Sequence, residues 1–340
     1  VYKRQEYYCL RDGKRVPRDL CWTSEGALEV TIQQVREDMR AHPEATVFSV
    51  SQMDGNDWAC HCDRCTKISE REGSEMGPVL IFVNRVAEAI QEEFPQNAII
   101  TFAYRWTRVP TKTVKPRDNV ILFLCNIECC FGHPMTACDH PANQAFVKQI
   151  EEWSRISKRL WIWNYETNFH HYMLPFPNYH TWAPNYRFLR DHHVTGLFTQ
   201  DDYQNRNAEL AAFGGYVRAK LLWDVDRDPE PAMREFLEGY YGEAAKPIRA
   251  YIDLLVNKVT DENIHMLIYD EYPWAYLPED VMEEADRLFD EAETLVADEP
   301  EVLERVRIAR LSLDYAVIEH LRRGATVDTS RVDREQSLYY

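Results

Sequence analysis

The feature that most constrains the fold is a repeated alternation of short apolar runs with helical patterns. Five runs rich in β-forming residues are separated by loops and by segments whose apolar residues recur every three or four positions. The predicted strands cover residues 45–52, 98–104, 120–127, 159–165 and 195–200. Strand, loop and helix repeated in this way are typical of a parallel sheet or barrel.

Helices are predicted between these strands, over about residues 24–40, 79–94, 143–157 and 184–192. Five strands are too few to close an eight-stranded barrel. The chain also starts at Val1, inside a pattern, so we expect it to be a fragment of a longer protein. The predicted fold class is therefore α/β: a (β/α)8 TIM-type barrel, truncated at its N-terminus, with about five to six β/α units present.

The two ends of the chain differ from this middle part. Residues 1–22 are polar and aromatic, and we expect irregular chain there. From residue 208 onward the pattern is helical, over 208–223, 231–258 and 279–323. We expect a partial catalytic barrel over residues 1–225, followed by a helical region over 226–340 that packs on the barrel.

One predicted strand leads into the most suggestive polar residue. Val120 to Cys125 form a continuous apolar run, which is typical of a strand buried on both faces. Glu128 follows this run, and Gly132 and Pro134 then turn the chain. Open α/β sheets and barrels keep their chemistry at the carboxyl ends of parallel strands, so we interpret Glu128 as functional. The alternative is a buried carboxylate that pairs with an arginine.

Polar and aromatic residues follow every predicted strand. Beside Glu128, the candidate residues are Gln52, Asp54, Tyr104, Arg105, Asn126, Trp163, Asn164, Tyr165, Asn168, His170, Gln200 and Asp201. One such strand end would mean little, but five together favour an enzyme. Trp163, Tyr165 or Tyr172 can form a platform for a sugar ring. The alternative is that their aromatic loop, residues 163–182, forms a small satellite core.

The spacing of Asn126 and Glu128 indicates a specific chemistry. Residues two apart on a strand share a face, so both side chains can point into one cavity. In glycoside hydrolysis a carboxylic acid protonates the leaving oxygen, and the N-acetyl group of the substrate can replace a protein nucleophile. Glu128 would be the acid, while Asn126 or Asp54 would orient the acetamido group; Asn126 can equally be a turn residue. The rivals are Glu166 as acid and Asp54, Asp201 or Asp202 as stabilising group.

Nine cysteines are present, and three of them lie within six residues. Cys60, Cys62 and Cys65 have the short spacings at which zinc takes thiolate ligands. A structural zinc site needs a fourth ligand, which another loop can supply if the loops meet. The candidates for that ligand are Cys129, Cys130 and Cys138. The alternatives are a disulfide and reduced packing thiols.

The formal net charge is −17 at pH 7. Binding to nucleic acid or to an anionic membrane surface needs clustered basic residues, so we expect neither partner. No apolar run is long enough to cross a bilayer, and we expect no membrane insertion. The sequence leaves the oligomeric state open.

Several motifs occur in an order that matches a known bacterial family. They are Ser-Val-Ser-Gln-Met-Asp-Gly at 49–55, Cys-x-Cys-x-x-Cys at 60–65, Phe-Val-Asn-Arg-Val-Ala at 82–87, Ile-Glu-Cys-Cys-Phe at 127–131, Trp-Asn-Tyr-x-Thr-Asn-Phe at 163–169 and Ala-Lys-Leu-Leu-Trp-Asp at 219–224. Over about residues 1–260, the chain resembles the family known as domain of unknown function 4838. Part of that family is recognised as glycoside hydrolase family 163, endo-β-N-acetylglucosaminidases that act on complex N-glycans.

This resemblance implies a (β/α)8 barrel preceded by another domain, and a retaining hydrolase that uses the acetamido group of its substrate. The family's Ile-Glu-Cys-Cys glutamate falls on Glu128. Many relatives carry a glutamate where this chain has Thr199, followed by Gln200 and Asp201, so substrate or activity can differ here. A location in the periplasm, outside the cell or at the surface of a bacterium is expected.

We therefore expect a glycoside hydrolase that cleaves glycans containing N-acetylglucosamine. This chemistry requires no cofactor, and a structural zinc on Cys60, Cys62 and Cys65 is the one metal considered. Two alternatives stay open. One is a barrel that binds carbohydrate without cleaving it, and the other is a zinc-stapled barrel with another hydrolytic activity.

Overall fold

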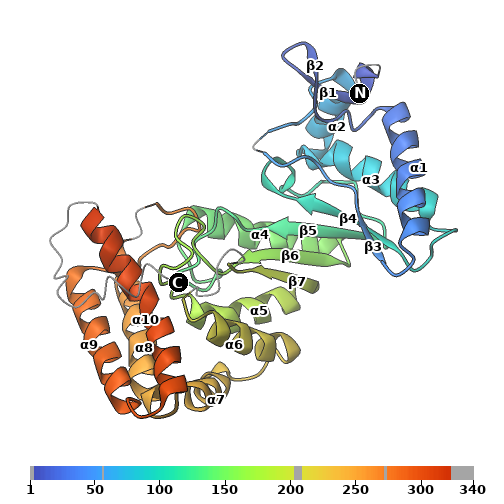
Figure 1. Ribbon diagram of the computed structural model, residues 1–340. Coiled ribbons are helices and arrows are strands. Elements are labelled where there is room, and N and C mark those ends of the chain that lie inside the picture. The colour runs from blue at the N-terminus through green and yellow to red at the C-terminus, as the bar shows by residue number, and fades with distance from the viewer. Residues whose placement is uncertain (1–3, 56, 203–208, 272–273, 323–340) are drawn as a thin grey trace. The chain divides into compact units, whose positions relative to one another are not determined.

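The structure is a computed structural model that describes residues 4–55, 57–202, 209–271 and 274–322 (Figure 1). The chain forms two compact units. The first comprises Val1–Asn126, Phe146–Asn164 and Asp191–Phe198, and the second comprises Ile127–Ala145, Tyr165–Arg190 and Thr199–Tyr340. Each unit is therefore assembled from three separate stretches of the chain.

Seven strands and ten α-helices lie within the described residues. The strands are β1 (Tyr8–Arg11), β2 (Lys14–Leu20), β3 (Val47–Ser49), β4 (Ala98–Ala103), β5 (Val120–Cys125), β6 (Leu160–Tyr165) and β7 (Val194–Gln200). The helices are α1 (Glu25–Ala41), α2 (Asp63–Glu72), α3 (Met76–Ile90), α4 (Pro141–Ile156), α5 (Trp182–Asp191), α6 (Ala211–Trp223), α7 (Pro229–Tyr241), α8 (Ala245–Asp261), α9 (Glu279–Leu295) and α10 (Pro300–Arg322). Short 3₁₀ turns occur at Gln5–Tyr7, Arg105–Thr107, Tyr179–Thr181, Gly242–Ala244 and Trp274–Tyr276.

Five strands form one curled, parallel sheet whose spatial order is the sequence order, β3-β4-β5-β6-β7. In its register Ile99 lies opposite Val120, and Leu122 lies opposite Leu160. Every residue of β5 except Phe123 is buried, which explains its unbroken apolar sequence. All five predicted strands are present, and the α/β class with a parallel sheet is confirmed.

The N-terminal segment corrects one prediction, because it forms a hairpin and not irregular chain. β1 and β2 pair antiparallel, with Arg11 opposite Lys14. Between them Asp12 and Gly13 both have positive φ, 48° and 74°. Asp-Gly favours a two-residue hairpin turn of this kind, and the polar composition of the strands concealed the signal. Pro17 in β2 has no N–H to donate, which a strand with a single neighbour tolerates.

Helix α2 was not among the helices predicted from the sequence. The helix ends at Gly73, whose φ of 66° suits a C-terminal cap. Its buried residues Cys65, Ser69 and Glu72 are three or four positions apart and so lie on one face. Because a thiol, a hydroxyl and a carboxylate form this face, apolar periodicity could not reveal the helix.

The core of the first unit centres on α3, which packs on β4 and β5 and against α1. Helix α3 carries ten buried residues, in keeping with a sequence that is apolar on most of its faces. Helix α1 begins at Ser24, whose hydroxyl accepts a hydrogen bond from the backbone N–H of Ala27 at 3.4 Å. This cap fixes the start of the helix where the sequence predicts it.

In the second unit α8, α9 and α10 pack side by side, and α6 packs on α7 (Figure 1). The helices predicted over 231–258 and 279–323 are each two consecutive helices, α7 and α8 in the first case and α9 and α10 in the second. The first is broken at Gly242, whose φ is 54°, and the second is broken before Pro300, which begins α10. The predicted helix ends at residues 208 and 323 lie outside the described residues, and the domain boundary at residue 225 stays a prediction.

Candidate functional site

The candidate residues lie at the carboxyl ends of the parallel strands and divide between the two units. Those in the first unit are Gln52, Asp54, Tyr104, Arg105, Asn126, Trp163 and Asn164. Those in the second unit are Glu128, Tyr165, Asn168, His170, Gln200 and Asp201. Contacts within each unit show which of these side chains lie together.

Four candidates of the first unit meet around Tyr104. Nε of Arg105 donates to the phenol oxygen of Tyr104 at 2.7 Å. Gln52 is buried, and its Nε2 donates to the carbonyl of Tyr104 at 3.4 Å and to Oγ1 of Thr107 at 2.7 Å. The pKa of Tyr104 is raised, because burial and the Asp54 carboxylate raise it by more than Arg105 lowers it. A cation, a phenol and an exposed carboxylate gathered here can bind the hydroxyl groups of a sugar.

Asn126 and Asn164 form a buried amide pair at the ends of β5 and β6. Nδ2 of Asn126 donates to Oδ1 of Asn164 at 2.6 Å, and the two residues are 3% and 6% exposed. Oδ1 of Asn126 has no hydrogen-bond partner among the residues that the structure describes. A buried acceptor without a partner costs about 1–3 kcal/mol, and Oε1 of Gln52 is a second such amide oxygen in the same unit.

Glu128 lies in a turn three residues after β5, which ends at Cys125. The predicted strand continued to residue 127, so the inference that Asn126 and Glu128 share one face of a strand was wrong. It is partly exposed, so solvent reaches it, as a general acid requires. The turn is anchored two residues further on. The backbone N–H of Cys130 donates to Oδ1 of Asn143 at 2.7 Å, and Nδ2 of Asn143 donates to the carbonyl of Cys130 at 2.9 Å. These two bonds hold the chain beside Glu128 in a fixed path.

The rival residues Glu166 and Asp201 belong to a buried polar network in the second unit. Oε2 of Glu166 accepts from Nδ2 of Asn178 at 3.0 Å and from Nε1 of Trp182 at 2.8 Å. Asp201 forms an ion pair with Arg218, whose side chain is 9% exposed. The structure therefore places both acids against partners inside the protein.

A polar cavity of about 20 Å³ lies within this network, lined by Glu166, Asp201, Glu209 and Arg218 among others. A space of that size holds about one water molecule and is too small for a sugar ring. Burial raises the pKa of Glu209 to about 7, and the phenol of Tyr179 donates a hydrogen bond to it. Sequence reasoning missed Arg218 and Glu209, which lie in or near a predicted helix with no local sign of their role.

Other candidates of the second unit bond to the protein itself. Tyr165 is buried and packs edge-on against Phe169, with ring centroids 5.6 Å apart. Oδ1 of the buried Asn168 accepts from the backbone N–H of His170 at 2.8 Å, which shapes the loop after β6. His170 itself is exposed. The carbonyl of Gln200 accepts from the backbone N–H of Glu166 at 2.9 Å.

Trp163 lies in a row of aromatic side chains on one face of the sheet. Its ring centroid is 4.8 Å from that of Phe198, 5.6 Å from Phe123 and 5.8 Å from Phe102. Phe198 is 47% exposed, so this row is open to solvent at one end. A role for Trp163 as a sugar platform stays a prediction.

The first unit also has an open groove of about 670 Å³, within the size range of small-molecule sites. Its lining includes Trp106, His61, Glu70 and Glu75. Trp106 follows β4, at the strand end where Tyr104 and its neighbours meet. The groove thus combines an aromatic side chain with carboxylates near that group.

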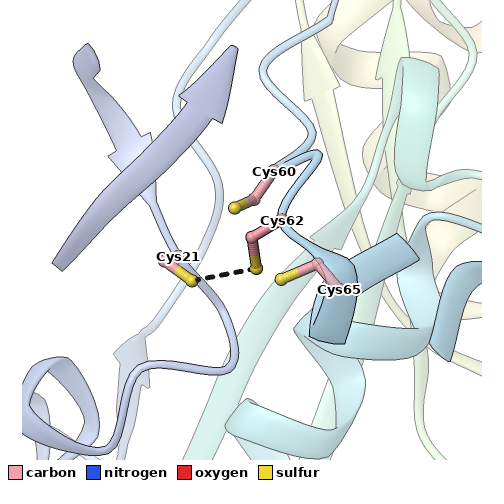
Figure 2. Close-up of side chains that lie close together, drawn as sticks. All are labelled: Cys21, Cys60, Cys62 and Cys65. Carbon is pink, nitrogen blue, oxygen red and sulfur yellow. Dashed lines mark hydrogen bonds between the residues drawn. The ribbon is translucent and has the colours of Figure 1, made fainter. Parts of the chain in front are cut away.

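The predicted thiol cluster has a fourth member, Cys21 (Figure 2). The sulfur atoms of Cys21, Cys60, Cys62 and Cys65 all lie within 4.8 Å of one another, and those of Cys21 and Cys62 are 3.6 Å apart. Thiolates in a tetrahedral zinc site have sulfur–sulfur distances of about 3.8 Å, given zinc–sulfur bonds of about 2.3 Å. These residues therefore fit a closed structural zinc site.

The expectation that Cys129, Cys130 or Cys138 completes this cluster was wrong. Cys21 directly follows β2 and lies 41 residues before Cys62. The β1–β2 hairpin, which was not predicted, brings it to the start of α2. An incomplete three-thiol motif was the signal that could have directed attention to the remaining cysteines.

The fold and these groups define an α/β protein with its candidate residues at the carboxyl ends of parallel strands. The chain belongs to the family described as domain of unknown function (DUF4838), whose profile matches residues 2–253. The membership inferred from the motifs is thereby confirmed. No curated protein matches the sequence.

Two solved structures are similar to the chain at low identity. A β-N-acetylhexosaminidase from Bacteroides fragilis is 13% identical with a TM-score of 0.34, and the match covers 64% of this chain and 48% of that one. A GH138 enzyme targeting pectin rhamnogalacturonan II is 10% identical with a TM-score of 0.39, and the match covers 91% and 49%. The chain spans about half the length of each.

The structure also bears on the expected partners. Among the described residues, no helix combines the length and the apolar character needed to span a membrane. The expected periplasmic, extracellular or surface location stays a prediction.

Proposed function

We propose that this chain is the catalytic part of a glycoside hydrolase that cleaves glycans containing N-acetylglucosamine. Its five parallel strands would form part of a (β/α)8 barrel, in which spatial order follows sequence order. One observation carries the proposal. A solvent-reachable Glu128 follows β5, and two residues before it Asn126 has a buried amide oxygen with no partner among the described residues.

Glu128 would act as general acid and then as general base. It would give a proton to the oxygen of the leaving sugar, and it would later take a proton from the attacking water. Its place in a turn at the carboxyl end of a parallel strand, partly exposed, supports this role. The anchoring of Cys130 by Asn143 would keep the carboxyl group in position.

Asn126 would orient the acetamido group of the substrate. Its Oδ1 would accept the acetamido N–H, which turns the acetamido carbonyl oxygen toward the anomeric carbon for attack. The hydrogen bond to Asn164 supports this role because it fixes the plane of the Asn126 amide. Asp54 is the alternative, since it lies exposed beside Tyr104. Tyr104, Arg105 and Gln52 would then bind sugar hydroxyl groups.

The test is the Glu128→Gln variant of the complete protein, assayed on N-glycans and on aryl N-acetylglucosaminides. Loss of a general acid lowers turnover by about 10²–10⁴-fold. The matched control is Glu151→Gln, which changes a partly buried glutamate of α4 outside the candidate site. Turnover of Glu128→Gln equal to that of the control would remove Glu128 from the mechanism.

A second function, carbohydrate binding without cleavage, is favoured by one observation. Glu166 and Asp201 bond to partners inside the second unit, and Thr199 stands where many relatives are expected to have a glutamate. A site poor in available carboxylates suits a binding protein. This alternative is supported if wild type and Glu128→Gln both bind glycans and neither releases sugar from any glycan of a broad panel.

We also propose that Cys21, Cys60, Cys62 and Cys65 bind a structural zinc. The ion would tie the β1–β2 hairpin to α2, because Cys21 follows β2 and Cys65 lies on α2. Around these sulfurs, the backbone N–H of Leu10 donates to Cys60 at 3.2 Å, as outer groups of thiolate sites commonly do. The role is structural, since all four positions of the metal would be taken by protein.

A further inference from the structure

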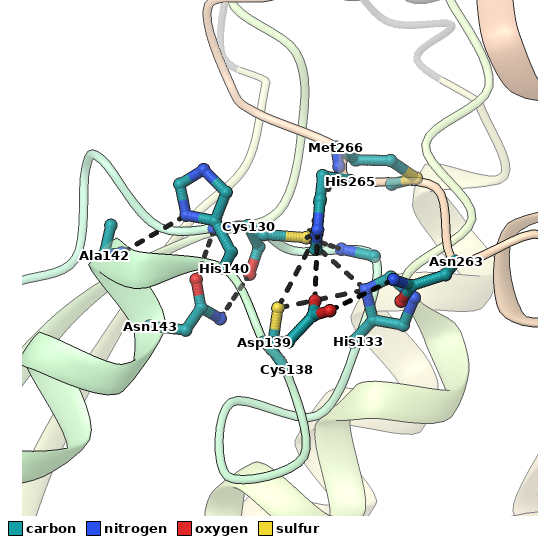
Figure 3. Close-up of polar contacts among 11 residues, drawn as sticks. Cys130, His133, Cys138, Asp139, His140, Ala142, Asn143, Asn263, His265 and Met266 are labelled. Atoms are coloured by element: carbon teal, nitrogen blue, oxygen red, sulfur yellow. Dashed lines mark hydrogen bonds and ion pairs between the residues drawn. The ribbon is translucent and has the colours of Figure 1, made fainter.

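A second group of metal-binding side chains lies in the second unit, and it contains Cys130 and Cys138, two of the thiols considered as a fourth ligand for the first cluster. Cys130, His133, Cys138 and His265 each place one ligand atom within 4.8 Å of the other three. Figure 3 shows the two sulfurs and the two imidazole rings gathered at one point. The first three residues come from the loop between β5 and α4, and His265 follows α8.

The distances within this group match a tetrahedral zinc site. Nδ1 of His133 lies 3.6 Å from the sulfur of Cys130 and 3.9 Å from that of Cys138. Nδ1 of His265 lies 3.4 Å from the sulfur of Cys130 and 3.8 Å from that of Cys138. Zinc bonds of about 2.3 Å to sulfur and about 2.0–2.1 Å to nitrogen place these atoms about 3.6 Å apart at tetrahedral angles.

Hydrogen bonds alone do not account for this arrangement. Each thiol has one proton, and each neutral imidazole has one ring proton to place on either nitrogen. Two thiols and two Nδ1 atoms can therefore make at most two S–H···N or N–H···S bonds. Four close sulfur–nitrogen contacts are present, and a single cation at the centre would satisfy all of them.

The surrounding groups are those that support a metal ligand. Nε2 of His265 lies 3.2 Å from Oδ1 of Asp139, and Oδ2 of the same carboxylate accepts from Nδ2 of Asn263 at 3.3 Å. A carboxylate on the far nitrogen orients a ligating histidine and fixes its tautomer. The sulfur of Cys130 also accepts from the backbone N–H of Gly132 at 3.3 Å and of Met266 at 3.4 Å. Such bonds stabilise a thiolate.

We propose that Cys130, His133, Cys138 and His265 bind one zinc ion in a closed structural site. Two thiolates and two imidazoles in tetrahedral array are the ligands that zinc prefers. Because the protein would fill all four positions, no coordination site is left for a substrate.

The ion would cross-link the loop after β5 to the segment after α8. These segments also meet through the backbone, where the N–H of Phe131 donates to the carbonyl of Met266 at 2.8 Å. Cys130 lies two residues after Glu128, so the same ion would hold the turn that carries the candidate acid. The zinc site itself does not depend on the hydrolase proposal, and metal binding tests it separately from turnover.

The test is the zinc content of the complete protein, purified without a histidine tag and without added metal. Cys130→Ser is expected to lose one zinc per chain relative to wild type. The matched control is Cys129→Ser, which removes the adjacent thiol, equally buried at 3% exposure and outside the group. Equal zinc content in folded Cys130→Ser and Cys129→Ser would overturn the proposal, as would a Cys130–Cys138 disulfide found in the wild type by mass spectrometry.

A second measurement decides the matter if Cys130→Ser does not fold. X-ray absorption of zinc in a Cys60→Ser/Cys62→Ser variant would report the second site alone. We expect two sulfur neighbours at about 2.3 Å and two nitrogen neighbours at about 2.0–2.1 Å. When His265→Cys is added to that variant, one ligand is exchanged for another, and the zinc should then have three sulfur neighbours and one nitrogen neighbour. A shell of unchanged composition in His265→Cys would exclude His265 as a ligand.

Asp139 is assigned as a positioning residue for His265. Asp139→Asn should weaken zinc affinity by about 10–100-fold in competition with a chelator. Asp139→Glu, which restores the carboxylate, should recover most of that affinity. Equal affinity in Asp139→Asn and wild type would remove Asp139 from the site.

Discussion

Nδ1 of His265 lies 3.4 Å from the sulfur of Cys130, although 135 positions separate the two residues in the sequence. Cys130 closes the turn that carries Glu128, and His265 follows the long helix α8. The contact joins the loop of the candidate acid to the helical part of the same unit. The position of Glu128 is therefore tied to residues far along the chain, and not only to the strand before it.

The first prediction concerns Cys21. Cys21→Ser should lose one zinc per chain and should destabilise the protein, because a structural zinc site contributes directly to folding. The measurements are metal content and the midpoint of thermal unfolding. Cys9→Ser is the control, since Cys9 is fully buried beside the cluster but is not among its four ligands. Loss of zinc in both variants would point to general unfolding of the region.

The second prediction separates Asn126 from Asp54 as the group that orients the acetamido substituent. Asn126→Ala should lower turnover of N-acetyl substrates by about 10²-fold or more, and Asp54→Asn should lower it less. In a substrate-assisted reaction, wild-type turnover should also fall as fluorine replaces the hydrogens of the acetamido methyl group, since the carbonyl oxygen becomes a weaker nucleophile. A larger loss in Asp54→Asn would reverse the assignment, and insensitivity to fluorine would argue for a protein nucleophile.

The third prediction concerns the ion pair between Arg218 and Asp201. Arg218→Leu leaves a carboxylate in the polar network without its cation, and breaking a buried pair in this way costs about 3–5 kcal/mol. Because the Asp201 side chain is 27% exposed, we expect the low end of that range. Arg190→Leu is the control, since its pair with Asp226 is largely exposed and its loss should cost much less. Chemical denaturation measures both, and equal costs would show that the Arg218 pair is solvent-screened.

The fourth prediction is that the free energy of unfolding changes with pH because of Glu209. Burial raises the pKa of Glu209 to about 7, above the ordinary value of 4.5 that it regains on unfolding. Between these values the folded state holds more protons than the unfolded state, so stability falls as pH rises from about 4.5 to about 7 and is level above that. The contribution lost is at most about 3 kcal/mol.

Glu209→Gln should remove this part of the pH profile. Its free energy of unfolding relative to wild type should increase from pH 5 to pH 8, as measured by denaturant titration at each pH. Glu262→Gln, which changes an exposed glutamate paired with Lys258, is the control and should track wild type. A parallel profile for Glu209→Gln and wild type would mean that Glu209 is ionised throughout this range.

Much of the fold could be read from the sequence because strands and helices leave local periodic patterns. The run from Val120 to Cys125 is apolar at every position because both faces of β5 are covered, and Glu128 stands out as a carboxylate three residues after that run. The wrong or missing predictions of secondary structure lie where the local sequence is polar. The hairpin around Asp12 and Gly13 and the helix α2 both lack an apolar stripe.

The candidate site was predictable only in part. The sequence located Glu128, Asn126 and the three thiols, because each lies next to a strong local motif. It did not locate Arg218 or His265, which approach their partners only when separate segments fold together. Arg218 sits within an ordinary helical pattern, and its pairing with Asp201 depends on how α6 packs near the end of β7.

The sequence by itself determined the alternation of strand and helix, the family and the position of the carboxylate at the end of β5. These depend on interactions among near neighbours in the chain, which composition and spacing record. Only the tertiary structure decided that Cys21 completes one cluster and that His265 completes another. A metal-ligand set is defined by distances of a few ångströms in space, and residues 41 or 135 positions apart reach such distances only when the chain has folded.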